Sequence, residues 1–162
     1  MRISFVLNRQ RVSLDTQPET LLIDVLRESF DQIGARPGCI QGECGFCSVL
    51  LDDKLALSCM LPMFLVRGRR VTTIDAFLQS PEYRDIELGF RRAGIEPCRF
   101  CVAGKVLTTY EVIRHARRPS AEELDHAAAA VQCRCTSYSR YRTAIRYAAE
   151  FRRKRENVRR RT

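Results

Sequence analysis

The chain has 162 residues, which suits one large domain or two small ones and excludes a large catalytic barrel. Hydrophobic residues make up 45% of it, enough for a packed core and too many for an intrinsically disordered chain. The net charge of +9 is concentrated at one end, since residues 152–162 carry +6 and the other 151 residues only +3. Because the body is nearly neutral, we expect no nucleic-acid partner.

The chain has eight cysteines, and their chemistry depends on the cellular compartment of the protein. No apolar run approaches the roughly 20 residues that span a bilayer. The first eight residues alternate in polarity and do not form a signal peptide. We therefore expect a cytoplasmic protein with no membrane partner, in which clustered cysteines bind metal more often than they form disulfides.

Residues 1–78 have the pattern of a small α+β domain. Short apolar and alternating runs predict strands, and apolar residues at helical spacing, preceded by Thr20 as a cap, predict one helix. A loop that contains Gly34 and Pro37 follows the helix and runs to Cys47. We expect strands at 3–7, 11–14, 48–51, 54–57 and 71–74, and the helix at 21–30.

The pattern becomes helical after Pro81. Ser120 and Glu123 form a capping-box sequence in front of one expected helix. With a boundary near residues 76–81, we expect an all-α domain at 79–155 and a basic tail at 156–162. The four helices are expected at 83–93, at 103–116, directly after Ser120, and at 138–155.

The first four cysteines follow a spacing known from two-iron clusters. Cys39-x4-Cys44-x2-Cys47, with Cys59 farther along, is the arrangement of plant-type [2Fe–2S] ferredoxins. Three thiolates then reach the metal from one tightly bent loop, and we expect its glycines to supply the necessary freedom in φ. The alternative is a zinc site or a set of buried thiols, although zinc sites usually use paired C-x2-C knuckles. The loop glycines are Gly38, Gly42 and Gly45.

The second four cysteines are ambiguous by spacing alone. They form the pairs Cys98-x2-Cys101 and Cys133-x-Cys135, each just before an expected helix. A helix N-terminus favours thiolates and an anionic cluster, which supports a second [2Fe–2S] site. A zinc site of four thiolates and free thiols remain as alternatives.

The cysteine motifs resemble those of a known family. Gly38-Cys39-Ile40-Gln41-Gly42-Glu43-Cys44-Gly45-Phe46-Cys47, Cys98-Arg99-Phe100-Cys101 and Cys133-Arg134-Cys135-Thr136 are similar to the motifs of the small iron–sulfur subunits of molybdenum hydroxylases. The group includes xanthine dehydrogenase and carbon monoxide dehydrogenase, and the resemblance covers about residues 2–152.

The resemblance implies a fold and a role. It implies an N-terminal β-grasp ferredoxin-like domain and a four-helix domain, each with one [2Fe–2S] cluster. The first would be held by Cys39, Cys44, Cys47 and Cys59, and the second by Cys98, Cys101, Cys133 and Cys135. Electrons would pass from a molybdopterin site on a large subunit, through the two clusters, to FAD on a medium subunit or to another acceptor. The chain itself would have no catalytic residue and bind no substrate.

The chain departs from the family pattern around the second set. Pro97 stands where the family has a glutamine that touches the pterin, Arg99 replaces a glycine, and Lys105 stands where the family has Met. Ser137 replaces another glycine. We expect the two cations to raise the potential of the nearby cluster, or to meet cofactor phosphates or acidic groups of a partner.

Two other functions are compatible with the cysteine pattern. One is a ferredoxin-like domain joined to a zinc domain that acts as a binding module. The other is a free-standing two-cluster electron carrier. The sequence does not name the substrate of a molybdenum enzyme, and a purine or related N-heterocycle is our expectation.

Overall fold

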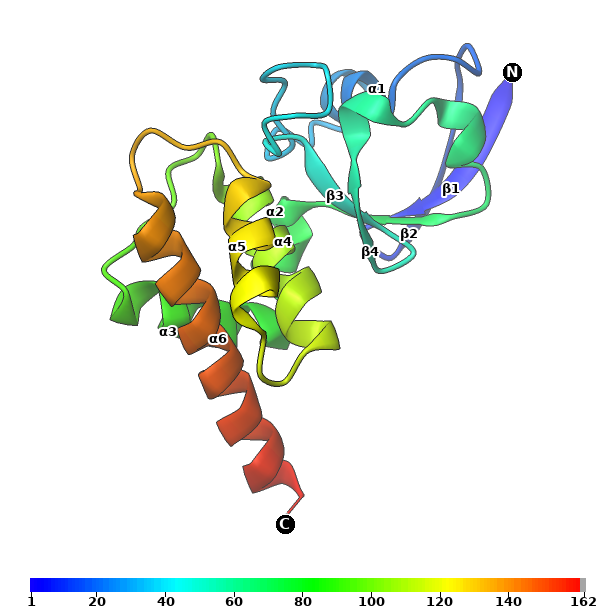
Figure 1. Ribbon diagram of the computed structural model, residues 1–162. Helices are drawn as coiled ribbons and strands as arrows, with labels where there is room; N and C mark the ends of the chain where they lie inside the picture. Colours follow the sequence, from blue (N-terminus) through cyan, green and yellow to red (C-terminus); the bar gives the residue numbers. More distant parts are fainter. Residues whose placement is uncertain (161–162) are drawn as a thin grey trace.

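The structure is a computed structural model that describes residues 1–160, with the strands in the first half and most helices in the second (Figure 1). The fold class is α+β, as predicted. No helix in this range is long and apolar enough to cross a membrane. The strands are β1 (Arg2–Leu7), β2 (Gln10–Asp15), β3 (Ser48–Leu51), β4 (Lys54–Leu57) and β5 (Arg70–Thr72). The helices are α1 (Leu22–Glu28), α2 (Ile74–Phe77), α3 (Pro81–Arg92), α4 (Val102–His115), α5 (Ala121–Ala129) and α6 (Tyr138–Arg159), and two 3-10 turns lie at Ser58–Met60 and Met63–Leu65.

The five strands form one mixed sheet in the order β2-β1-β5-β3-β4. β1 pairs antiparallel with β2 and parallel with β5, and β3 pairs antiparallel with both β4 and β5. The alternation predicted for β1 is present, since Ile3, Phe5 and Leu7 are buried in one core with Leu22 and Leu26 of α1. The sheet and α1 therefore share a core.

Two local predictions in this half are wrong. The last strand ends at Thr72, because Ile74 already begins the short helix α2 and packs in the helical core. Thr20 does not cap α1: Leu21 occupies the cap position, without a side-chain cap bond. The Thr20 hydroxyl instead accepts a hydrogen bond from the Thr16 hydroxyl at 3.1 Å.

The helices after Ser80 agree with the prediction to within a few residues at their ends. The Ser120 capping box is confirmed, since its hydroxyl accepts from the Glu123 amide and its own amide donates to the Glu123 carboxylate. α3 and α6 pack closely because Gly89 has no side chain, and a Cβ there would lie 2.5 Å from the Ala148 nitrogen. This contact allows α3 and α6 to pack side by side.

α6 continues through Arg159, so residues 156–159 of the predicted tail are helical. Of that tail, Arg161 and Thr162 lie outside the described residues. Just before this extension, Arg155 pairs with Asp85 of α3 at 2.7 Å. The Asp85 side chain is only 4% exposed, so this pair neutralises a buried charge.

We predict that Arg155→Met lowers the free energy of unfolding by about 3 kcal/mol, because it leaves the buried Asp85 carboxylate without its partner. Lys154→Met is the matched control, since Lys154 is exposed on the same helix. Thermal unfolding followed by circular dichroism measures the effect. Equal midpoints for the two variants would show that the ion pair contributes no stability.

Candidate metal centres

The first cysteine set lies in the loop between α1 and β3 and in the turn after β4. Cys44, Cys47 and Cys59 are buried, and Cys39 is half-buried. The sulfur atoms of Cys47 and Cys59 are 3.3 Å apart. Two thiolates on one tetrahedral metal, with bonds of about 2.3 Å, lie about 3.8 Å apart. These two thiols are thus close enough to share one metal ion.

Backbone amides converge on Cys39. Its sulfur accepts hydrogen bonds from the amides of Gln41, Glu43 and Cys44 at 3.4, 3.2 and 3.3 Å. These donors lower the pKa of the Cys39 thiol to about 6, with the Gln41 amide as the largest cause. Ile40, between Cys39 and Gln41, has a φ of 55°, which is rare for a β-branched side chain. The loop therefore maintains a strained turn that directs amides at a thiolate.

The three loop glycines serve two different purposes. Gly42 and Gly45 have φ values of 79° and 77°, which confirms the predicted need for conformational freedom. For Gly38 the prediction is wrong, because its φ is not in the left-handed region. A Cβ on Gly38 would instead lie 2.6 Å from the sulfur of Cys44, so the space for that thiolate requires glycine.

The second cysteine set lies at the ends of helices, as predicted. Cys101 occupies the cap position of α4, and Cys133 and Cys135 precede α6. The sulfur of Cys101 is 3.6 Å from that of Cys98 and 3.8 Å from that of Cys133. Cys135 is exposed but near enough to Cys98 that the Cys98 thiolate raises its pKa. The sulfur atoms of Cys98, Cys101 and Cys133 thus lie together, and Cys135 is exposed to solvent in the same segment as Cys133.

The thiols of this second set differ in acidity. Burial raises the pKa of Cys101 to about 12. Burial also acts on Cys133, but amides of Thr136 and Cys135 and the charge of Lys105 outweigh it and bring its pKa to about 7. Metal binding removes the protons of all ligating thiols, so the protein must supply compensating positive charge and donors.

Close sulfur contacts join Cys47 to Cys59 in the first set, and Cys101 to both Cys98 and Cys133 in the second. Within residues 1–160, no three His, Cys, Asp or Glu side chains converge in a way that suits a single metal ion. Close thiol pairs fit two irons, each of which takes two thiolates from the protein. The donor set, the spacing and the amides directed at sulfur therefore fit [2Fe–2S] clusters.

Backbone contacts bring the regions of the two cysteine sets together. The amide of Gln132, next to Cys133, donates to the carbonyl of Cys44 at 3.2 Å. A Cβ on Gly104 of α4 would lie 2.6 Å from the carbonyl oxygen of Gly45. The backbone of α4 therefore lies against the backbone of the first cysteine loop, and a side chain at Gly104 would push the two apart. In Figure 1, the loops before α4 and α6 lie at the end of the helical half that faces the sheet.

A second contact joins the same two regions. The guanidinium of Arg36, just before the first cysteine loop, donates to the carbonyl of Arg99 at 2.9 Å. The same group lies over the ring of Phe100, 5.1 Å from its centroid. The segment between Cys98 and Cys101 is thus held against the first cysteine loop.

The two cations expected beside the second set occupy different environments. Arg99 has an exposed side chain, whereas Lys105 is 1% exposed. The expectation that Lys105 meets phosphates or acidic groups of a partner is therefore wrong, because the folded chain covers it. Ser137 stands in place of a glycine and accepts a hydrogen bond from the Arg140 amide, so it caps α6.

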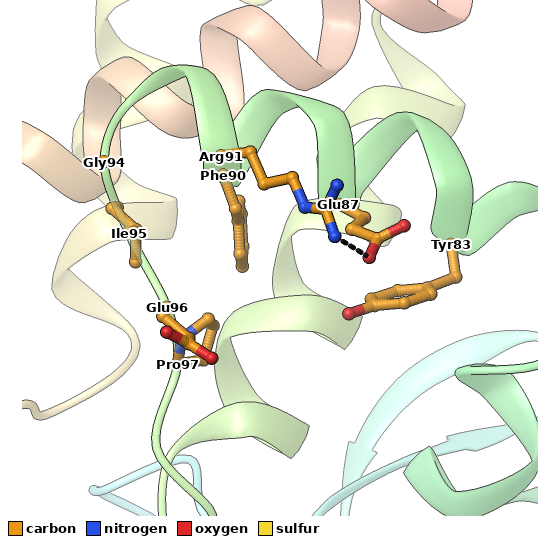
Figure 2. Close-up of a pocket in the computed structure, with 8 residues that line it drawn as sticks. All are labelled: Tyr83, Glu87, Phe90, Arg91, Gly94, Ile95, Glu96 and Pro97. Carbon is orange, nitrogen blue, oxygen red and sulfur yellow. Dashed lines mark ion pairs between the residues drawn. The ribbon is translucent and has the colours of Figure 1, made fainter.

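A surface pocket of about 490 Å³ lies beside Pro97, between α3 and the segment that leads to Cys98 (Figure 2). Its wall carries an ion pair between Arg91 and Glu87 at 3.4 Å (Figure 2). None of the residues that line it is a cysteine. The pocket is thus separate from the thiol sites.

The chain is similar to several known proteins. The [2Fe-2S] binding domain family matches residues 73–146. One nicotinate dehydrogenase subunit of Pseudomonas putida is 32% identical over 152 residues, which cover 94% of this chain and 97% of that protein. The alpha subunit of isoquinoline 1-oxidoreductase from Brevundimonas diminuta is 30% identical, with 91% of this chain and 97% of that protein covered.

The chain belongs to the family of small iron–sulfur subunits of molybdenum hydroxylases. The crystal structure of quinoline 2-oxidoreductase from Pseudomonas putida matches with a TM-score of 0.82 and 31% identity, covering 94% of this chain and 96% of that one. Aldehyde oxidoreductase from Desulfovibrio gigas also gives a TM-score of 0.82, at 29% identity, but 96% of this chain corresponds to only 17% of that protein. The family predicted from the cysteine motifs is confirmed, and so are [2Fe–2S] clusters as the cofactors of this iron–sulfur subunit.

We predict that Gly104→Ala weakens the magnetic interaction between the two reduced clusters, because the added methyl group forces α4 away from the Gly45 carbonyl. The splitting in the electron paramagnetic resonance (EPR) spectrum measures this interaction, and iron content should stay at the wild-type level. Gly68→Ala is the control for backbone strain without a collision, since Gly68 has a φ of 73° but a Cβ there meets no atom within 4 Å. An unchanged splitting in Gly104→Ala would show that this contact does not set the separation of the sites.

Proposed function

We propose that the chain relays single electrons within a molybdenum-dependent hydroxylase or dehydrogenase, through one [2Fe–2S] cluster in each cysteine set. The observation that carries this proposal is the hydrogen bond from the Gln132 amide to the Cys44 carbonyl. It connects a residue adjacent to one proposed ligand, Cys133, directly to another ligand, Cys44. The first cluster would be held by Cys39, Cys44, Cys47 and Cys59, and the second by Cys98, Cys101, Cys133 and Cys135.

The proposed domains follow the two cores of the structure. Residues 1–78 form the β-grasp ferredoxin-like domain, and the mixed sheet with α1 packed in its core supports this. Residues 79–155 form the four-helix domain from α3, α4, α5 and α6. The helical core also takes in Leu50, Ile74 and Phe77, so it extends across the proposed boundary. Packing of this kind holds the two domains together.

The protein's own residues hold and insulate the clusters. A bound [2Fe–2S] cluster supplies one-electron chemistry. The chain provides eight thiolates, amides that donate to sulfur, and burial that excludes water from Cys44, Cys47, Cys59 and Cys101. The hydrogen bond from the Gln132 amide to the Cys44 carbonyl gives a short connection from one site to the other.

We propose that the chain works in the cytoplasm with a large subunit that binds molybdopterin and a medium subunit that binds FAD. Several similar proteins are themselves named as subunits. Their names include nicotinate, isoquinoline and quinoline, which are aromatic N-heterocycles. We therefore propose an N-heteroaromatic substrate for the complex.

Metal analysis of the full chain, purified without oxygen, tests the assignment. We expect four irons and no zinc per chain. Cys59→Ala should lose two irons and one EPR signal, and Cys133→Ala should lose two irons and the other signal. Each variant serves as the control for the other. Two irons and one zinc in the wild-type chain would instead support the zinc-domain alternative.

A further inference from the structure

Lys105 carries its charged group inside the protein, where no described residue forms a hydrogen bond with it. The residue is 1% exposed, and its Nζ has no hydrogen-bond partner within residues 1–160. A buried ammonium is costly unless it is paired and hydrogen-bonded. A negatively charged group beside this ammonium would therefore stabilise it.

The neighbouring hydroxyl groups do not fill this role. The hydroxyls of Tyr141 and Thr109 both donate to the carbonyl oxygen of Lys105, at 2.9 and 2.7 Å. Burial raises the pKa of the Tyr141 phenol above its ordinary value, so this group stays neutral. What Tyr141 offers the ammonium is its ring face, with Nζ 4.9 Å from the centroid.

The side chain of Lys105 faces the second cysteine set. Lys105 lies in the first turn of α4, and its amide donates to the carbonyl of Cys101 at 2.9 Å. Its charge lowers the pKa of Cys133 and acts in the same direction on Cys135. The ammonium is thus fixed beside the proposed ligands by the helix backbone and by the ring of Tyr141.

A cluster held by four thiolates provides the missing negative charge. Its net charge is two minus when oxidised and three minus when reduced by one electron. Attraction to a nearby cation grows with that charge, and burial of the Lys105 side chain reduces screening by solvent. Reduction changes one iron from ferric to ferrous, and no bond is made or broken.

We propose that the Lys105 ammonium is the counter-ion of the second cluster and raises its reduction potential above that of a cluster with a neutral residue at this position. The inference rests on the proposed function, because it needs a cluster at the second set. It gives Lys105 a tuning role and makes the exposed Arg99 a minor contributor, since solvent screens its charge. The electron comes from the molybdenum site in the complex, or from a chemical reductant such as dithionite in the isolated chain.

Lys105→Met tests the proposal, since methionine is unbranched, flexible and uncharged. In a redox titration of the full chain followed by EPR, the ratio of reduced to oxidised second cluster at a fixed potential should fall at least tenfold. For a one-electron couple this is about 59 mV. The first cluster should keep its potential, and Lys105→Arg should recover most of the shift.

Lys154→Met is the matched control, because it removes the same charge from an exposed site on α6. It should leave both clusters unchanged. If Lys105→Met binds a normal second cluster with the wild-type potential, the proposal is wrong. Iron content separates this outcome from failure of the proposed function, which would appear as absent or zinc-filled sites in the wild-type chain.

A measurement on the unmodified sequence covers the case in which the variant loses its second cluster. The chain has three lysines, Lys54, Lys105 and Lys154, and all can be labelled with ¹⁵N at the side-chain nitrogen. We expect a ¹⁵N hyperfine coupling on the EPR signal of the reduced second cluster and none on that of the first. The absence of any such coupling would overturn the proposal.

Discussion

The close approach of two backbones, at Gly45 and Gly104, is the constraint on which the arrangement of both metal sites depends. At this point a single methyl group would collide with a carbonyl oxygen. The approach brings the Gln132 amide to the Cys44 carbonyl, and so connects the first cysteine loop to the segment before α6. The sheet and the helices each have their own core, and this contact sets where the two cysteine sets lie relative to each other.

The two sites balance negative charge by different means. At the first, three amides donate to Cys39, and a strained Ile40 helps to direct them. At the second, the positively charged side chain of Lys105 is buried beside the thiols. Amide dipoles and a full positive charge stabilise a reduced cluster to different extents. The structure thus offers a physical basis for two clusters of unequal potential within one small chain.

The sequence predicted the parts of the fold that depend on local pattern. Strands β3 and β4, the Ser120 capping box and the start of α6 were predicted at their observed positions, because alternation and capping are short-range signals. The role of Gly38 was missed, because it depends on the position of the Cys44 sulfur. The burial of Lys105 was missed for the same kind of reason, since its ring partner Tyr141 lies 36 residues away. Tertiary contacts of this kind leave no periodic signal in a sequence.

The proposed function depends above all on electron transfer between two clusters inside one molecule. The direct test is to photoreduce the full chain with less than one electron per molecule and to follow both clusters as the electron redistributes. A rate that does not depend on protein concentration is the result that this structure predicts, because the two sites are joined by the contact between Gln132 and Cys44. A rate that rises in proportion to protein concentration would contradict the account, because exchange would then require collisions between molecules.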